Sequence, residues 1–151
     1  MPLFSSPRPA NCETQSPTTR RLQVFVLFNG HEATVSALRT ALAFVEGLGG
    51  EILIASTQLV PYPLPLDHPS VDGRILLSQI CDAISESGMP CVTPPKVLIA
   101  YARDCCSGWH SILPPHCIVV VGRAKRSLRQ RFHAWRAAKS LGKMGFEVLL
   151  A

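Results

Sequence analysis

The sequence predicts an α/β protein built on an open, doubly wound sheet of five parallel strands. The run 117–121 is apolar at every residue and stops at Gly122, which is typical of a strand buried on both faces inside a parallel sheet. Similar runs recur along the chain, separated by segments with helical periodicity, as the crossovers of a parallel sheet require. The composition, 47% apolar and 17% charged, fits a globular domain.

The first half of the chain supplies two strands and two helices. Residues 22–28 and 51–57 are short apolar runs that predict strands. Between them, 31–48 carries apolar residues at the spacing of a helix that packs on a sheet. A second helix is indicated by the apolar positions of 76–84, and Gly88 favours its termination.

The second half continues the alternation. Residues 96–102 predict the third strand, and Asp104 is placed to cap a short helix that runs to Leu113. After the strand 117–121, a fourth helix is followed by a last strand over 146–150. The apolar residues of that helix are spaced by three or four and are predicted to face the core: Leu128, Phe132, Trp135, Ala138 and Leu141.

Positive charge is concentrated in the fourth helix and the loop before it. The formal net charge is +5, and residues 123–143 contain eight Lys and Arg but no Asp or Glu. Such a segment favours an anionic partner, which we expect at Arg129, Arg131 and Lys139. Since Phe132 and Trp135 are predicted to face the core, they are not expected to stack on nucleic-acid bases.

Length and composition predict one domain, residues 22–151, preceded by a flexible tail over 1–21 that is rich in Pro, Ser and Thr. No apolar run approaches the 18 or so residues of a membrane span, so we expect a cytoplasmic protein without membrane contact. Cys81 and Cys117 lie in apolar patterns and are predicted to be packed thiols. The role of the adjacent pair Cys105 and Cys106 stays open.

Two loops carry the turn glycines that could border a ligand crevice. In doubly wound sheets the crevice lies beyond the carboxyl ends of the strands, where the strand order reverses. The loop after the first predicted strand contains Asn29 and Gly30, and the loop after the fourth contains Gly122, Arg123 and Lys125. Both are also common turn sequences, so a structural role is equally compatible with them.

The chain resembles the universal stress protein family from residue 22 to residue 151. The resemblance rests on the order of the elements, on Phe28-Asn29-Gly30-His31-Glu32 after the first strand, and on Ile118-Val119-Val120-Val121-Gly122 at the fourth. It implies a Rossmann-like sheet of the adenine-nucleotide alpha-hydrolase type. It also implies a homodimer through the last strand, with contacts from Phe146, Val148 and Leu150.

The resemblance includes departures from the pattern of family members that bind ATP. Those members carry Gly-x-x-Gly, nine residues, and then Gly-Ser or Gly-Thr after the fourth strand. Here Gly122 is followed by Lys125 at the second glycine position, and Trp135 and Arg136 stand nine residues further on. Asn29 replaces an acidic residue, and Trp135 is expected to fill space that a triphosphate needs. A different loop length would change this comparison.

We therefore expect a binding and regulatory protein with a degenerate nucleotide site that does not bind ATP in the usual way. No cofactor, metal site or catalytic residue is expected, and the chain contains none of the common hydrolase or Walker motifs. Two alternatives remain open: a switch that binds ATP or another adenine nucleotide, and a binder of anions or nucleic acid through the basic fourth helix. The candidate nucleotide-binding residues are Asn29, Gly30, Thr57, Gly122, Arg123, Lys125 and Arg126.

Overall fold

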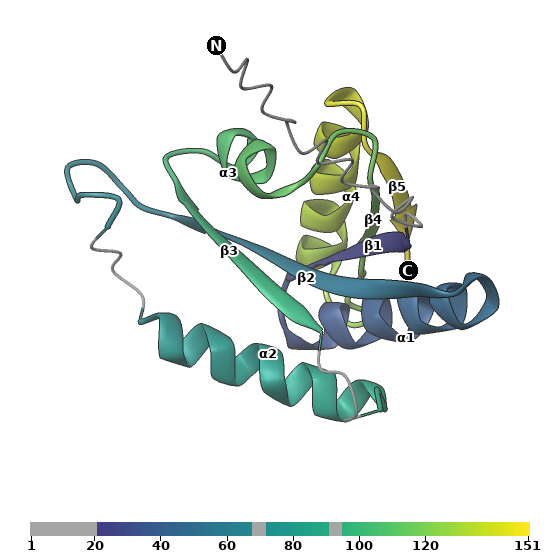
Figure 1. Ribbon diagram of the computed structural model, residues 1–151. Helices are drawn as coiled ribbons and strands as arrows, with labels where there is room; N and C mark the ends of the chain where they lie inside the picture. Colours follow the sequence, from purple (N-terminus) through teal and green to yellow (C-terminus); the bar gives the residue numbers. More distant parts are fainter. Residues whose placement is uncertain (1–20, 68–71, 91–94) are drawn as a thin grey trace, which may run out of the picture.

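The computed structural model describes residues 21–67, 72–90 and 95–151. Nearly all of the predicted tail, 1–21, lies outside the described residues. The described part forms five strands and four helices in strict alternation (Figure 1). In chain order they are β1 Leu22–Leu27, α1 His31–Leu48, β2 Gly50–Leu59, α2 Gly73–Ser87, β3 Lys96–Ala102, α3 Cys105–Ile112, β4 Ile118–Val121, α4 Leu128–Lys143 and β5 Glu147–Leu150.

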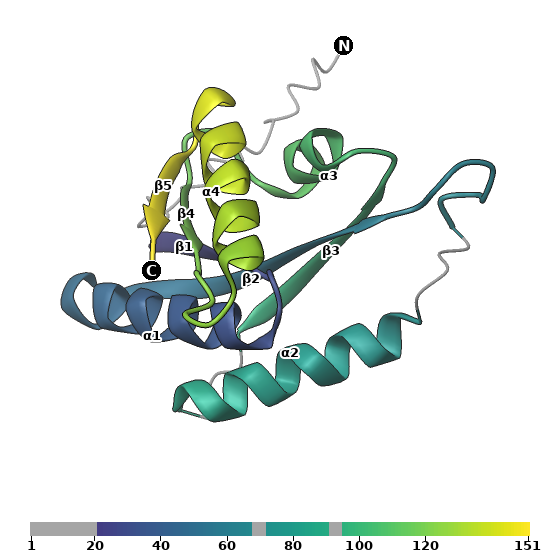
Figure 2. The same ribbon diagram turned by 180° about the vertical axis from the view of Figure 1, so that it is seen from behind.

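The five strands form one parallel sheet in the order β3-β2-β1-β4-β5, which confirms the predicted fold class. Helices α1 and α2 cover one face and α3 and α4 the other (Figures 1 and 2). Successive side chains of a strand point to opposite faces, so every residue in the centre of β1 is buried. Val24 and Val26 pack toward α1 and α2, whereas Phe25 and Leu27 pack toward α3 and α4.

Local sequence accounts for most of the helix ends. Asp104 caps α3 as predicted, because its Oδ1 accepts a hydrogen bond from the Ser107 amide at 2.9 Å. Helices α1 and α2 end at Gly49 and Gly88, both in the left-handed conformation that glycine adopts readily.

The predicted orientation of α4 is wrong. Leu128, Phe132 and Trp135 are 80%, 55% and 48% exposed, and the fully buried residues of this helix are Ala134 and Leu141. The predicted stripe advances 13 residues in four steps, less than four full turns. Its two ends, Leu128 and Leu141, therefore lie about 140° apart around the helix axis and cannot share one face.

Among the described residues, strand β5 lies at an edge of the sheet and pairs only with β4. The expected dimer contact through Phe146 needs correction, because Phe146 precedes β5 and is buried in the chain's own core, 6.1 Å from the ring of His110. Val148 also packs partly into that core, which leaves Leu149 and Leu150 as the exposed apolar side chains of the strand.

Candidate functional site

The reversal of strand order falls between β1 and β4. These strands are parallel neighbours, with Leu27 in register with Val121 at their carboxyl ends. The chain leaves β1 toward α1 on one face of the sheet and leaves β4 toward α4 on the other (Figure 1). The two predicted loops therefore lie next to each other at the position where doubly wound sheets bind ligands.

Gly122 is required by packing between these loops. A Cβ atom at Gly122 would lie 1.7 Å from the carbonyl oxygen of Ala33 in the first turn of α1. In the neighbouring loop, Gly30 has φ 89° and the Asn29 amide donates to Thr34 Oγ1 at 3.3 Å. Gly122 thus permits the close approach of its loop to α1, and Gly30 permits the positive φ before α1, whether or not a ligand is bound.

A cavity of about 430 Å³ opens at the carboxyl ends of β1 and β2, on the face of the sheet covered by α3 and α4. We call it the strand-end cavity. Its lining combines apolar side chains with thiols, an imidazole, a guanidinium and neutral polar groups. It is formed by Leu27, Phe28, Asn29, Thr57, Cys105, Cys106, Trp109, His133, Arg136, Ala137 and Ser140.

The hydroxyl of Thr57 is buried in the wall of this cavity without a hydrogen-bond partner among the described residues. Helix α3 approaches it closely, since a Cβ atom at Gly108 would lie 2.3 Å from Thr57 Cγ2. A buried polar group without a partner costs about 1–3 kcal/mol. Only a hydrogen-bonding group that reached Thr57 Oγ1, which is itself almost fully covered, would remove that cost.

Arg123 and Lys125 lie at a different place, beside α1. Together with Ser36 they line two adjoining grooves of about 290 and 320 Å³. The Lys125 amide donates to Glu32 Oε1 at 3.2 Å, and the Arg123 amide donates to the Ala151 carbonyl at 2.9 Å. Two amides that could have faced a phosphate are therefore occupied within the chain.

The structure thus divides the predicted site. Asn29 and Thr57 line the strand-end cavity, Arg123 and Lys125 line the grooves beside α1, and Arg126 is exposed outside the lining of all three. Sequence reasoning missed three polar residues of α4 that line the cavity, namely His133, Arg136 and Ser140. Their spacing of three and four places them on one helix face, and this was the available signal.

The loop between β4 and α4 also corrects the motif comparison. It spans residues 122–127, and α4 begins at Leu128, with Ser127 Oγ accepting from the Gln130 amide at 3.3 Å. The nine-residue spacer of ATP-binding family members therefore has no counterpart here. Trp135 lies inside α4 with an exposed side chain, so it does not fill a triphosphate site.

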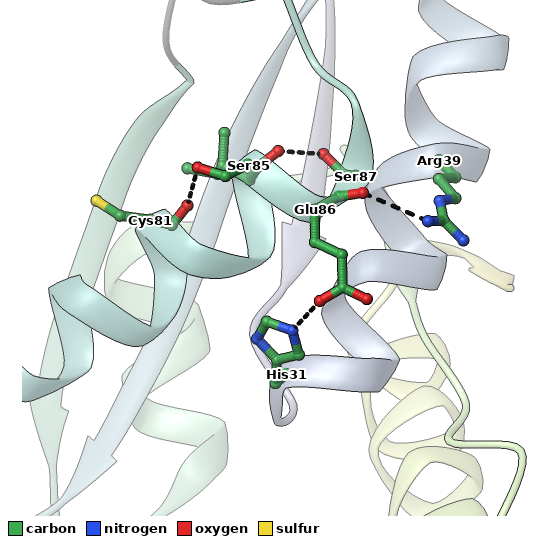
Figure 3. Close-up of polar contacts among 7 residues, drawn as sticks. His31, Arg39, Cys81, Ser85, Glu86 and Ser87 are labelled. Atoms are coloured by element: carbon green, nitrogen blue, oxygen red, sulfur yellow. Dashed lines mark hydrogen bonds and ion pairs between the residues drawn. The ribbon is translucent and has the colours of Figure 1, made fainter.

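Polar contacts tie the start of α1 to the end of α2 (Figure 3). The imidazole of His31 pairs with the carboxylate of Glu86, and Arg39 Nη2 donates to the Glu86 carbonyl at 3.3 Å. Within α2, Ser85 and Ser87 hydroxyls donate to the carbonyls of Cys81 and Ile84. His31 lines a groove beside α1, but its ring points to α2 and is already engaged.

The cysteines differ in their environments. Cys117 is buried as predicted, and burial raises the pKa of its thiol to about 11. The prediction for Cys81 is wrong, because its side chain is exposed on α2. Cys105 and Cys106 begin α3 and line the strand-end cavity. Partial burial is the largest cause that raises the pKa of Cys105, and the negative charges of Cys106 and Asp104 raise it further. The Cys105 thiol is therefore protonated at neutral pH and a weak nucleophile.

The described residues form neither a membrane-spanning helix nor a cluster of metal ligands. None of their helices is both long and apolar enough to cross a bilayer. Groups of three or more His, Cys, Asp or Glu side chains arranged to hold a metal ion were not found among the same residues.

Similarity to known proteins is found in the fold and not in the sequence. No family model and no curated protein sequence matches the chain. A universal stress protein crystallised in complex with cAMP matches at 12% identity and a TM-score of 0.58, covering 87% of this chain and 97% of that one. A universal stress protein from Archaeoglobus fulgidus matches at 10% identity and a TM-score of 0.50, covering 85% and 92%. The resemblance predicted from the sequence is thus confirmed in the fold.

Proposed function

We propose that this chain, which has the universal stress protein fold, is a binding and regulatory protein that holds an adenine mononucleotide in the strand-end cavity without a catalytic step. The observation that carries the proposal is the Thr57 hydroxyl, which has no hydrogen-bond partner among the described residues and lies in the wall of a cavity at the carboxyl ends of β1 and β2, beside the reversal of strand order. The structural neighbour with cAMP supports this class of ligand for the fold.

The lining of the cavity suits the parts of such a ligand. Phe28 and Trp109 offer apolar surface for a base, whereas His133 and Arg136 supply nitrogen donors for a phosphate. Thr57 and Asn29 add hydrogen-bonding groups on the sheet side. The volume of about 430 Å³ falls in the range of small-molecule sites.

The loop after β4 argues against a triphosphate held in the usual way. Backbone amides and a helix N-terminus normally hold such phosphates. Here Glu32 occupies the Lys125 amide, and its carboxylate would repel a phosphate at that position. The alternative of an ATP switch would need Arg123, Lys125 and Arg126 to hold the phosphates with their side chains.

Thr57→Val tests the role of the cavity. Without ligand, the substitution is expected to raise the free energy of unfolding by about 1 kcal/mol, because it removes a buried hydroxyl that has no hydrogen-bond partner in the described part of the chain. With AMP, it is expected to weaken binding by roughly fivefold to tenfold, since the ligand loses a hydrogen bond. Urea unfolding and the rise of the melting temperature with AMP concentration measure the two effects.

The matched control is Thr34→Val. Thr34 is also buried, but its hydroxyl accepts the Asn29 amide, so its loss should destabilise the protein without ligand. A Thr57→Val protein that loses stability as the control does, while AMP binding is unchanged, would contradict the assignment of the cavity.

The proposal includes a homodimer through the free edge of β5. An exposed edge strand that carries apolar side chains is prone to pair with another chain. Leu150→Lys is therefore expected to shift a dimer to a monomer in multi-angle light scattering, whereas Leu48→Lys, at an exposed position in α1, should leave it intact. A dimer that survives the Leu150 substitution would argue against this edge.

A cytoplasmic location also belongs to the proposal. Four cysteines of the described residues, at positions 81, 105, 106 and 117, are free thiols, and three of them are exposed. Exposed free thiols fit a reducing compartment better than an oxidising one.

A further inference from the structure

Helix α4 exposes aromatic and cationic side chains together. Its solvent side, which we call the α4 outer face, consists of Leu128, Phe132, Trp135, Arg136, Lys139 and Lys143. Phe132 and Trp135 are each about half exposed, although aromatic side chains of this size are usually buried. The apolar contacts of α4 with the sheet are made by Ala134, Ala137 and Leu141, so the outer face is not needed for the core.

The side chains of the outer face form an ordered cluster. The rings of Phe132 and Trp135 stack at a centroid distance of 5.9 Å and an interplanar angle of 30°. The guanidinium of Arg136 lies 6.0 Å from the centroid of Phe132, and Lys139 Nζ lies 5.0 Å from that of Trp135. Aromatic surface and positive charge are thus presented side by side.

The segment that carries the cluster contains cationic side chains and no carboxylates. Residues 123–143 include eight Lys and Arg but no Asp or Glu. The residues first expected to bind an anion do not form one face, since Arg129 and Arg131 lie about 160° apart around α4. Arg131 lines a groove beside α1, whereas Lys139 belongs to the outer face.

We propose that the α4 outer face binds single-stranded nucleic acid, with bases stacking on Phe132 and Trp135 and phosphates pairing with Lys139 and Lys143. Sequence-tolerant proteins for single strands combine exposed rings with a positively charged track in this way. The outer face adjoins the strand-end cavity, because Arg136 belongs to both. Stacking on Phe132 and Trp135 and the contacts of Lys139 and Lys143 do not depend on the mononucleotide.

An anionic membrane is the other class of partner with complementary charge, and the outer face suits it less well. A helix that lies in a membrane interface needs an apolar face along its length. On α4 the exposed apolar residues end at Trp135, and Lys139 and Lys143 continue the stripe. Two rings and flanking cations match bases and phosphates better than they match acyl chains.

Fluorescence anisotropy with a labelled oligouridine of about 12 nucleotides tests the proposal at low and moderate salt. Trp135→Ala and Phe132→Ala are each expected to weaken binding about tenfold, and Trp135→Phe to retain most of it, because any aromatic ring can stack. Lys139→Gln is expected to reduce the slope of log affinity against log salt by about 0.7, the value for one phosphate contact with a single strand.

The controls use exposed residues of α2, on the opposite face of the sheet. Leu77→Ala and Arg74→Gln should leave the affinity and its salt dependence unchanged. Equal losses in the α2 and α4 variants, or no binding by the wild-type protein at low salt, would overturn the proposal. Binding to phosphatidylserine vesicles without binding to the oligonucleotide would overturn it in favour of a membrane.

Two further binding measurements distinguish the α4 outer face from the mononucleotide site. Thr57→Val should leave oligouridine binding unchanged, and Trp135→Ala should leave AMP binding unchanged, since Trp135 does not line the strand-end cavity. Loss of both ligands on Trp135→Ala, with the fold intact by circular dichroism, would contradict the separation of the two surfaces.

Discussion

Replacing Gly122 by alanine is expected to lower the free energy of unfolding by about 3 kcal/mol or more, one of the two largest effects that the structure predicts. The new methyl group would meet the backbone of Ala33 at 1.7 Å, and neither loop can move without disturbing β4 or the start of α1. Overpacking of this kind typically costs 1–3 kcal/mol, and contact with backbone falls at the upper end. A melting temperature lower by about 10 °C would be the measured result.

Gly47→Ala is the control for this prediction. Gly47 lies in α1, and a Cβ atom there would have no neighbour within 4 Å. Alanine is favoured over glycine in a helix by about 1 kcal/mol, so this variant should be as stable as the wild type or more stable. If Gly122→Ala unfolds at the same temperature as Gly47→Ala, the close approach of Gly122 to the backbone of Ala33 is contradicted.

Leu141→Ala is expected to lower the free energy of unfolding by about 3 kcal/mol, because it leaves a cavity between α4 and the sheet. Leu128→Ala, in the same helix, should change it by less than about 0.5 kcal/mol, since this side chain is exposed. Urea unfolding of the two variants compares them directly.

The pair of leucines decides how α4 is oriented. The sequence pattern placed both on the core face, whereas the structure places them on opposite sides. Similar losses of stability for the two variants would show that the predicted stripe faces the core. The rings of Phe132 and Trp135 would then be buried, and the α4 outer face would have no basis.

The fold was predictable because its signals are local. Continuous apolar runs marked every strand, and the bounds of α1 and β3 agree with prediction to the residue. Gly88 ends α2 as predicted, in the left-handed conformation that glycine adopts readily. The extension of β2 to Leu59 was missed, because its last polar residues pair with β3 only in the assembled sheet.

The orientation of α4 was not predictable by the same means. Its sequence offers two stripes, one with the larger apolar side chains and one with alanines and Leu141. The rule that large apolar residues face the core selected the wrong stripe. The small side chain of Ala134, fully buried against the sheet, shows that close approach of the helix decided the outcome.

The candidate site was predicted in part. Asn29 was expected at the cavity because it follows the first strand, where the carboxyl ends of parallel strands meet at one edge of the sheet. Thr57 was also a candidate, and it lies near the carboxyl end of β2. Trp109, His133 and Arg136 were missed, because α3 and α4 converge on the cavity only after the chain has crossed the sheet. The length of the loop after β4 depended on where α4 begins, and Ser127 as its cap was the signal that the motif comparison overlooked.

The most direct test of the proposed site is a calorimetric titration of the nucleotide-free protein with AMP, cAMP and Mg-ATP at one salt concentration. We expect AMP or cAMP to bind, and ATP to bind no more tightly than AMP, because the amides of Arg123 and Lys125 are already occupied within the chain. Binding of ATP about tenfold or more tightly than AMP would contradict this account by showing that the loop after β4 holds the additional phosphates. The absence of heat with all three nucleotides would contradict the mononucleotide site itself.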